Sequence, residues 1–182
     1  MKFTPTRTAA WIFLAVSLVS CEVEDDSDDQ LDVATVRAFI VEGLEKNKEM
    51  DIEFARAIPD SALRWAPNAD VRDFAEQVVH AADNAWVASG LGIESRTFGD
   101  TAVVLNDNDA LAEAVAQAYD WILNAARELP DEEFTETVEF FGAKIQRWRV
   151  FMEAIEHATW TRGQLVPYFH AHGVPVPEVQ FF

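Results

Sequence analysis

Residues 157–177 read HATWTRGQLVPYFHAHGVPVP, and apolar side chains continue the same spacing upstream. At about 100° per residue these side chains recur on one side of a helix, so we predict a long helix over residues 143–171. Gly173 can supply a left-handed C-terminal residue, and Pro175 and Pro177 cannot continue a helix. The segment therefore predicts the last long helix of an α-helical domain.

A second stripe on this predicted helix mixes polar and apolar side chains. It contains His157, Thr161, Gln164 and Tyr168. A helix that carries apolar side chains on nearly opposite sides is expected to lie between neighbouring helices. His157 with Gln164 and Tyr168 is the kind of group that lines a pocket, although a single histidine inside a helical protein is more often a satisfied interior residue.

Three further helices are predicted upstream, because apolar residues there recur about every 3.6 residues. They cover residues 33–58, 71–89 and 110–129. Asp70 and Asp109 are the expected N-caps of the second and third helices, and Pro130 ends the third. Residues 135–141 are β-branched and aromatic, so their structure stays ambiguous. Four long helices with short or medium links predict an all-α fold, a four-helix bundle.

The N-terminal residues resemble a bacterial lipoprotein signal. Lys2 and Arg7 flank the start of an apolar run, AAWIFLAVSLVS, that is shorter than the ~20 residues that span a bilayer. Cys21, the only cysteine in the chain, follows this run directly. It stands at the position of the lipobox cysteine, which is acylated in bacterial lipoproteins. We therefore expect residues 1–20 to be a cleaved signal peptide and Cys21 to be lipidated. An ordinary secretory signal and an uncleaved membrane anchor are the alternatives.

The charge distribution indicates what surrounds the domain. Residues 21–32 contain many acidic residues and no basic one, which predicts a solvated acidic tether. The tether leads to a bundle over residues 33–177 and a short tail over 178–182. The net charge of −18 argues against nucleic acid as a partner. The sequence thus predicts an extracytoplasmic protein of the cell envelope, held to the membrane by its lipid.

The motif in residues 157–177 resembles the closing helix of the DinB/YfiT-like family. In that family a histidine precedes an Arg-Gly-Gln triplet, which is followed by an aromatic residue, a glycine and a proline. The matching residues here are Arg162-Gly163-Gln164, Tyr168, Gly173, Pro175 and Pro177. The segment from Trp65 to His80 is also similar to the beginning of that family's second helix. The resemblance covers about residues 33–177 and implies the DinB type of four-helix bundle.

The resemblance also implies a metal site, because many members bind a divalent ion through three histidines. Carried over by position, the ligands would be His80, His157 and Thr161. Two imidazoles at i and i+4 on one helix chelate an ion, and a threonine at the third position removes a strong donor. Glu76 and Glu153 each lie four residues before a histidine and could supply an oxygen, or could be solvated or paired with arginines. Two histidines and a carboxylate suit Zn, Ni, Mn or Fe.

Two functions follow from these observations. Characterised relatives include thiol-dependent transferases and isomerases, so one hypothesis is a divalent-metal-dependent enzyme in which Gln164 or Tyr168 contacts the substrate. The other is a non-catalytic envelope protein with a degenerate metal site, which binds a small ligand or a partner protein in the same pocket. Thr161 and the scarcity of small thiols outside the cytoplasm favour the second hypothesis. The relatives also suggest a homodimer.

Overall fold

The structure is a computed structural model that describes residues 32–178. These residues lie in the second of two compact units, which covers residues 31–182. The predicted signal peptide, Cys21, nearly all of the predicted tether and the end of the predicted tail fall outside the described residues. None of the helices that the structure describes is long and apolar enough to cross a membrane.

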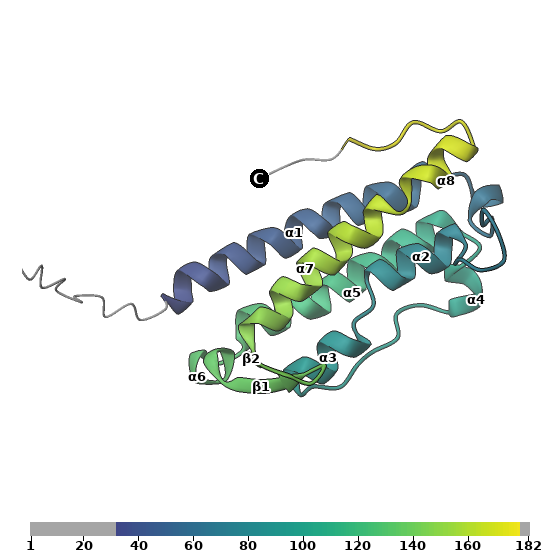
Figure 1. Cartoon of the computed structure of the whole chain (residues 1–182). Coiled ribbons are helices and arrows are strands. Elements are labelled where there is room, and N and C mark those ends of the chain that lie inside the picture. Colours follow the sequence, from purple (N-terminus) through teal and green to yellow (C-terminus); the bar gives the residue numbers. More distant parts are fainter. Residues whose placement is uncertain (1–31, 179–182) are drawn as a thin grey trace, which may run out of the picture. The chain divides into compact units, whose positions relative to one another are not determined.

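Helices make up most of the described residues, as the sequence predicts, and the longer ones lie side by side (Figure 1). These are α1 (Val33–Ala57), α2 (Phe74–Ala81), α5 (Asn108–Glu128) and α7 (Trp148–Gly163). Shorter helices are η1 (Asp60–Ala62), α3 (Ala85–Leu91), α4 (Thr101–Val104), α6 (Asp131–Thr135) and α8 (Val166–Ala171). Helix α1 packs on α5 and α7, and α2 packs on both of those helices.

The core lies between these helices and is built from large apolar side chains. Fully buried members include Phe54, Phe74, Phe134, Phe151 and Phe169. Helices α1 and α7 approach closely at Gly43, where an added Cβ would lie 2.8 Å from the Ile155 side chain. This contact places α7 directly against α1, and the opposite side of α7 is left to meet α2.

Two predicted helix starts are shifted by a few residues. The N-cap of α2 is Asp73 and not Asp70, because Asp73 and Glu76 form a reciprocal capping box. In it the Asp73 carboxylate accepts a hydrogen bond from the Glu76 N–H at 2.9 Å. The N-cap of α5 is likewise Asp107 and not Asp109. In both cases the carboxylate that reaches the first-turn amides determines where the helix begins.

The prediction of one helix over residues 71–89 is wrong, because the chain turns between α2 and α3. Asn84 lies at the turn, and its buried side-chain amide bonds the backbone of Arg96 in both directions. The Asn84 Nδ2 donates to the Arg96 carbonyl at 3.1 Å, and the Arg96 N–H donates to Asn84 Oδ1 at 3.2 Å. This long-range pair competes with helix continuation and ties the following loop to the end of α2.

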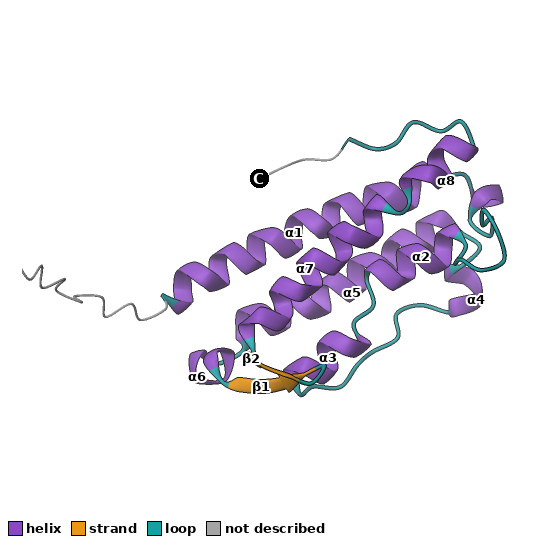
Figure 2. Ribbon diagram, viewed as in Figure 1, coloured by secondary structure: helices purple, strands orange, loops and turns teal. Residues whose placement is uncertain are grey.

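The ambiguous segment before Gly142 forms a strand, and the residues after it form a second strand where we predicted the start of a helix (Figure 2). β1 (Thr137–Phe140) and β2 (Ala143–Gln146) pair in antiparallel register. Phe141 and Gly142 form the two-residue turn, with φ of 48° and 80°. The hairpin lies on α3, since an added Cβ at Gly90 would come within 2.7 Å of the Phe140 ring.

The prediction of a continuous helix over residues 143–171 is therefore wrong at its start, and it is also wrong near Pro167. Helix α7 ends at Gly163, and α8 begins at Val166 with the proline in its first turn. Pro167 has no N–H to donate, and its ring would clash with the carbonyl four residues earlier. Gly173 does adopt a left-handed conformation after α8, with φ of 66°, as predicted.

Candidate functional site

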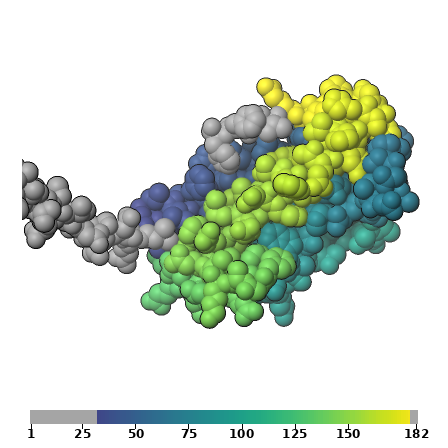
Figure 3. Space-filling view, in the orientation of Figure 1, coloured from purple at the N-terminus to yellow at the C-terminus, as the bar shows by residue number. Residues whose placement is uncertain are grey.

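His80 near the end of α2 and His157 in α7 face each other across the gap between these helices. Their Nε2 atoms lie 3.3 Å apart, and their ring centroids are 4.8 Å apart with the planes nearly perpendicular. Both side chains are half-buried. The space-filling view shows the hairpin and α7, in green to yellow, beside the teal segment that contains α2 (Figure 3).

The separation of the two nitrogens fits a single first-row metal ion. Bonds of ~2.0–2.1 Å from one ion to both Nε2 atoms, which are 3.3 Å apart, would subtend about 105–110°. That is the angle of a tetrahedral site. The two imidazoles could therefore bind one ion together. Without an ion, one ring can donate a hydrogen bond to the other.

The third position of the predicted ligand set offers only a hydroxyl. Thr161 is buried one turn after His157 in α7. Glu76, a proposed substitute, caps α2 and also accepts a hydrogen bond from Arg64 at 3.2 Å. Glu153 is exposed. Within residues 32–178 no group of three His, Cys, Asp or Glu side chains is placed to hold a metal.

Burial sets the charge state of the two rings. It lowers the pKa of His80, and the positive charge of Arg72 lowers it further. Burial also lowers the pKa of His157, while Asp83 and the Ala81 backbone carbonyl oppose that effect. Both rings are therefore neutral near pH 7, which is the form that binds metal ions. Among the described residues, the buried Nδ1 of His157 has no hydrogen-bond partner of proper geometry.

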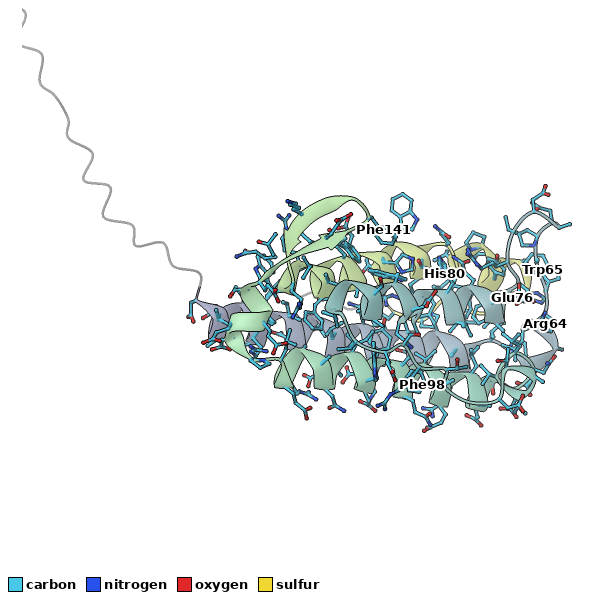
Figure 4. The ribbon with its side chains drawn as sticks, turned by 90° about the horizontal axis from the view of Figure 1, so that it is seen from below. Arg64, Trp65, Glu76, His80, Phe98 and Phe141 are labelled. Carbon is cyan, nitrogen blue, oxygen red and sulfur yellow. The ribbon has the colours of Figure 1, made fainter. Side chains whose placement is uncertain are left out.

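Aromatic side chains cover one side of the histidine pair. The Trp86 ring meets the His157 ring edge to face at 5.3 Å. Phe141 at the hairpin tip lies 6.4 Å from Trp86 and is 83% exposed. Figure 4 shows Phe141 and Phe98 on opposite sides of His80. The pair is thus bordered by the hairpin on one side and by the loop after α3 on the other.

Gln164 and Tyr168, the predicted pocket residues, form hydrogen bonds with Gln77 and with Arg72. Gln164 Oε1 accepts a hydrogen bond from the buried Gln77 at 2.6 Å. The Tyr168 hydroxyl donates to the carbonyl of Arg72 at 2.7 Å, and its ring packs edge-on against Trp65. The first contact joins the C-terminal segment to α2, and the second joins it to the residues just before α2.

Sequence reasoning missed the role of Arg162, which lies in a buried polar network. Its guanidinium donates to Asp51 at 2.7 Å and to Asn47 at 2.9 Å, both on α1. The Tyr119 hydroxyl on α5 donates to the other Asp51 oxygen at 2.5 Å. Burial raises the pKa of Asp51, and the charge of Arg162 opposes that effect. The sequence feature that could have revealed this network is the pair Asn47 and Asp51, which lie at i and i+4 on the inner face of α1.

A cavity of about 560 Å³ opens beside His80, between α2, α4, α5 and the loop that contains Phe98. Its polar lining includes Arg72, Arg96 and Asn84. Its apolar lining includes Phe98, Val104, Leu105, Val115 and several alanines. The volume lies within the range of small-molecule sites, ~300–1,000 Å³. Neither Gln164 nor Tyr168 lines this cavity.

Comparison with known proteins identifies the family. The DinB family model matches residues 39–182. The structure is similar to the crystal structure of a DinB-like protein from Bacillus cereus ATCC 10987, with a TM-score of 0.59 and 19% sequence identity over 78% of this chain and 95% of that one. Among curated proteins no significant match is found. Because the family match covers most of the sequence and the fold agrees with it, this chain belongs to the DinB family.

Proposed function

We propose that this protein is an envelope-anchored, ligand-binding four-helix bundle of the DinB type with a weak two-histidine site for a divalent metal ion. The observation that carries the proposal is the convergence of the His80 and His157 Nε2 atoms from different helices. Neutral imidazoles at that separation are ready to share an ion without rearrangement of the backbone. Zn and Ni are the favoured ions, because imidazole ligands suit them.

The donor set supports binding more than catalysis. A buried threonine hydroxyl at position 161 is a poor substitute for a third imidazole, and Glu76 is already engaged by a cap and an ion pair. An ion held by two histidines keeps open positions, which a donor atom of a ligand could fill. We therefore rank a ligand-binding protein above a thiol-dependent transferase, the alternative that the family suggests.

The proposed location of the protein rests on its N-terminal sequence. The signal-like run that ends at Cys21 supports lipidation of that cysteine and a place in the cell envelope. Several acyl chains on one residue would hold the protein stably at a membrane. The acidic residues that follow the cysteine would keep the domain away from anionic headgroups.

Titration of the full chain with Zn²⁺ and Ni²⁺ tests the metal site. We expect one ion per chain, with binding abolished in His80→Ala and in His157→Ala. His170→Ala is the matched control, because His170 is an exposed histidine on α8, and it should bind as the unchanged protein does. Equal binding by the His80, His157 and His170 variants would contradict the proposal.

A variant with a third histidine tests the site without relying on the weak metal binding that we expect of the unchanged protein. Thr161→His places a third imidazole one helical turn after His157, which should raise metal affinity by tenfold or more. The larger side chain must fit a buried position, so its unfolding should be measured beside its metal binding. A folded Thr161→His protein with no gain in affinity would show that the three positions do not converge on one ion.

A further inference from the structure

Two arginines at the cavity beside His80 have no carboxylate partner in the part of the chain that the structure describes. Within residues 32–178, six other arginines form ion pairs with carboxylates. Arg72 and Arg96 have no such partner among the described residues, although the chain carries 32 acidic residues against 14 basic ones. Both arginines are exposed, and both line the same cavity.

The backbones that carry these arginines are fixed by buried side chains. Asn84 uses both ends of its amide on the backbone of Arg96. Tyr168 donates its hydroxyl proton to the carbonyl of Arg72 at 2.7 Å. The structure therefore positions both residues, while their guanidinium groups have no carboxylate partner within residues 32–178. The Arg72 charge also lowers the pKa of both site histidines, so its field extends into the site.

The two carboxylates that line the cavity, those of Glu76 and Asp83, are each held by hydrogen bonds. Glu76 accepts hydrogen bonds from Arg64 and from the Asp73 N–H. Asp83 accepts a hydrogen bond from the Ala85 N–H at 2.9 Å. These bonds keep each carboxylate close to its own helix end. The guanidinium groups of Arg72 and Arg96 are the cations that the cavity lining offers to an anion.

Much of the remaining lining is apolar. Phe98 and Leu105 line the cavity, and Val115 contributes from α5. Guanidinium groups bind carboxylates through paired, charge-assisted hydrogen bonds, and an apolar wall favours a hydrocarbon or aromatic body. Glu76 and Asp83 also place negative charge at the cavity, which repels a doubly charged phosphate more than a singly charged carboxylate.

From these observations we propose that the cavity binds a small organic monocarboxylate, with its carboxylate on Arg72 and Arg96 and its apolar body against Phe98. The inference rests on the proposed ligand-binding function and names the class of ligand. It does not require that the histidines hold a metal.

The probes are octanoate, 4-phenylbutanoate and 2-naphthoate, each paired with its uncharged primary amide. They are titrated calorimetrically into the full chain in a non-ionic detergent with EDTA present. We expect at least one carboxylate to saturate one site per chain and to bind about tenfold more tightly than its amide. Failure of all three carboxylates to saturate, or equal binding of acid and amide, would overturn the proposal.

Variants locate the site. Arg72→Gln and Arg96→Gln should each weaken carboxylate binding about tenfold and leave amide binding unchanged. Phe98→Ala should weaken both. Arg149→Gln is the matched control, because Arg149 also lacks a carboxylate partner in the described residues but lies over the Trp148 ring, away from the cavity. An equal loss in the Arg149 variant would overturn the proposal.

The carboxylate titration can succeed or fail independently of the metal titration. Carboxylate binding that survives EDTA but is lost in Arg96→Gln supports the cavity, whatever the histidines bind. Zinc binding without any carboxylate binding would leave the metal site standing and overturn the ligand class.

Discussion

At the scale of single residues, His80 and His157 combine two properties that favour metal binding. They come from different helices, and their Nε2 atoms lie within hydrogen-bond distance. Burial also lowers the pKa of both rings, so protons compete little with other ligands near neutral pH. Two neutral imidazoles side by side are a common basis for metal binding.

The lowered pKa values predict a pH dependence of stability. At about pH 7 both rings are largely neutral in the folded and the unfolded chain, so folding buries little charge at these two positions. As the pH falls below the ordinary value of 6.5, the unfolded chain binds protons before the folded chain does, and the free energy of unfolding decreases. The decrease stops once the pH passes the lowered folded-state values.

Urea unfolding at about pH 7 and about pH 5.5 measures this effect. The double variant His80→Asn/His157→Asn should lose less stability between these two conditions than the unchanged chain does. His170→Asn, at an exposed position, should behave as the unchanged chain. A pH dependence that is the same in the double variant would show that the pair does not titrate as described.

At the scale of secondary-structure elements, the buried network of Arg162 joins α7 to α1 and, through Tyr119, to α5. Arg162 and Asp51 are 3% and 2% exposed, so removal of one charge strands the other away from water. The Arg-Gly-Gln triplet thus has a structural role in its first residue, next to the site.

Arg162→Met should lower the free energy of unfolding by about 3–5 kcal/mol, because Asp51 is left buried without its partner. The double variant Asp51→Leu/Arg162→Met should be less damaged than the sum of its single variants. Arg127→Met provides the comparison, since its ion pair with Glu45 is exposed and is worth at most about 1 kcal/mol. Urea unfolding of the set checks these values, and equal losses for Arg162 and Arg127 would contradict the account.

At the hairpin tip we predict a substitution that raises the free energy of unfolding. Phe141 adopts φ of 48° in a two-residue turn that normally favours Asn-Gly, and its ring is mostly exposed. Phe141→Asn should therefore raise the free energy of unfolding, by up to about 1 kcal/mol. Thermal unfolding measures the change. A clear loss of stability would mean that the contacts of Phe141 with Phe140 and Trp86 outweigh the backbone strain.

Local sequence signals predict the helices well but not where they break. The residues of α1 repeat regularly behind a side-chain cap, so its bounds follow from the sequence almost to the residue. The break at Asn84 depends on a bond to Arg96, twelve residues away, which no local pattern reveals. Pro167 did carry a local signal, but the apolar periodicity around it outweighed that signal in the prediction.

The candidate site was only partly predictable for the same reason. His80 and His157 were named through the family resemblance, because 77 residues separate them and spacing alone cannot pair them. The cavity with Arg72 and Arg96 was not predicted. It forms where the loop held by Asn84 crosses α5, so it depends on the tertiary contact that the sequence did not show.

At the scale of the whole molecule, we propose that a lipid anchor at Cys21 holds an acidic binding domain at a membrane. The anchor is testable through Cys21, the only cysteine. Cys21→Ser should move the protein from the membrane fraction to the soluble fraction and abolish incorporation of a labelled fatty acid. Glu22→Gln is a suitable control beside it. Retention of Cys21→Ser in the membrane fraction with unchanged labelling would contradict the predicted lipoprotein.

The most direct measurement for the histidine pair is NMR of the ring nitrogens in the full chain labelled with ¹⁵N-histidine, during titration with Zn²⁺. We expect the Nε2 resonances of His80 and His157 to shift together and to reach their end point at one equivalent, while those of His170 and His172 stay unchanged. If the two Nε2 resonances respond at different zinc ratios, or if neither responds, the two histidines do not form a single site.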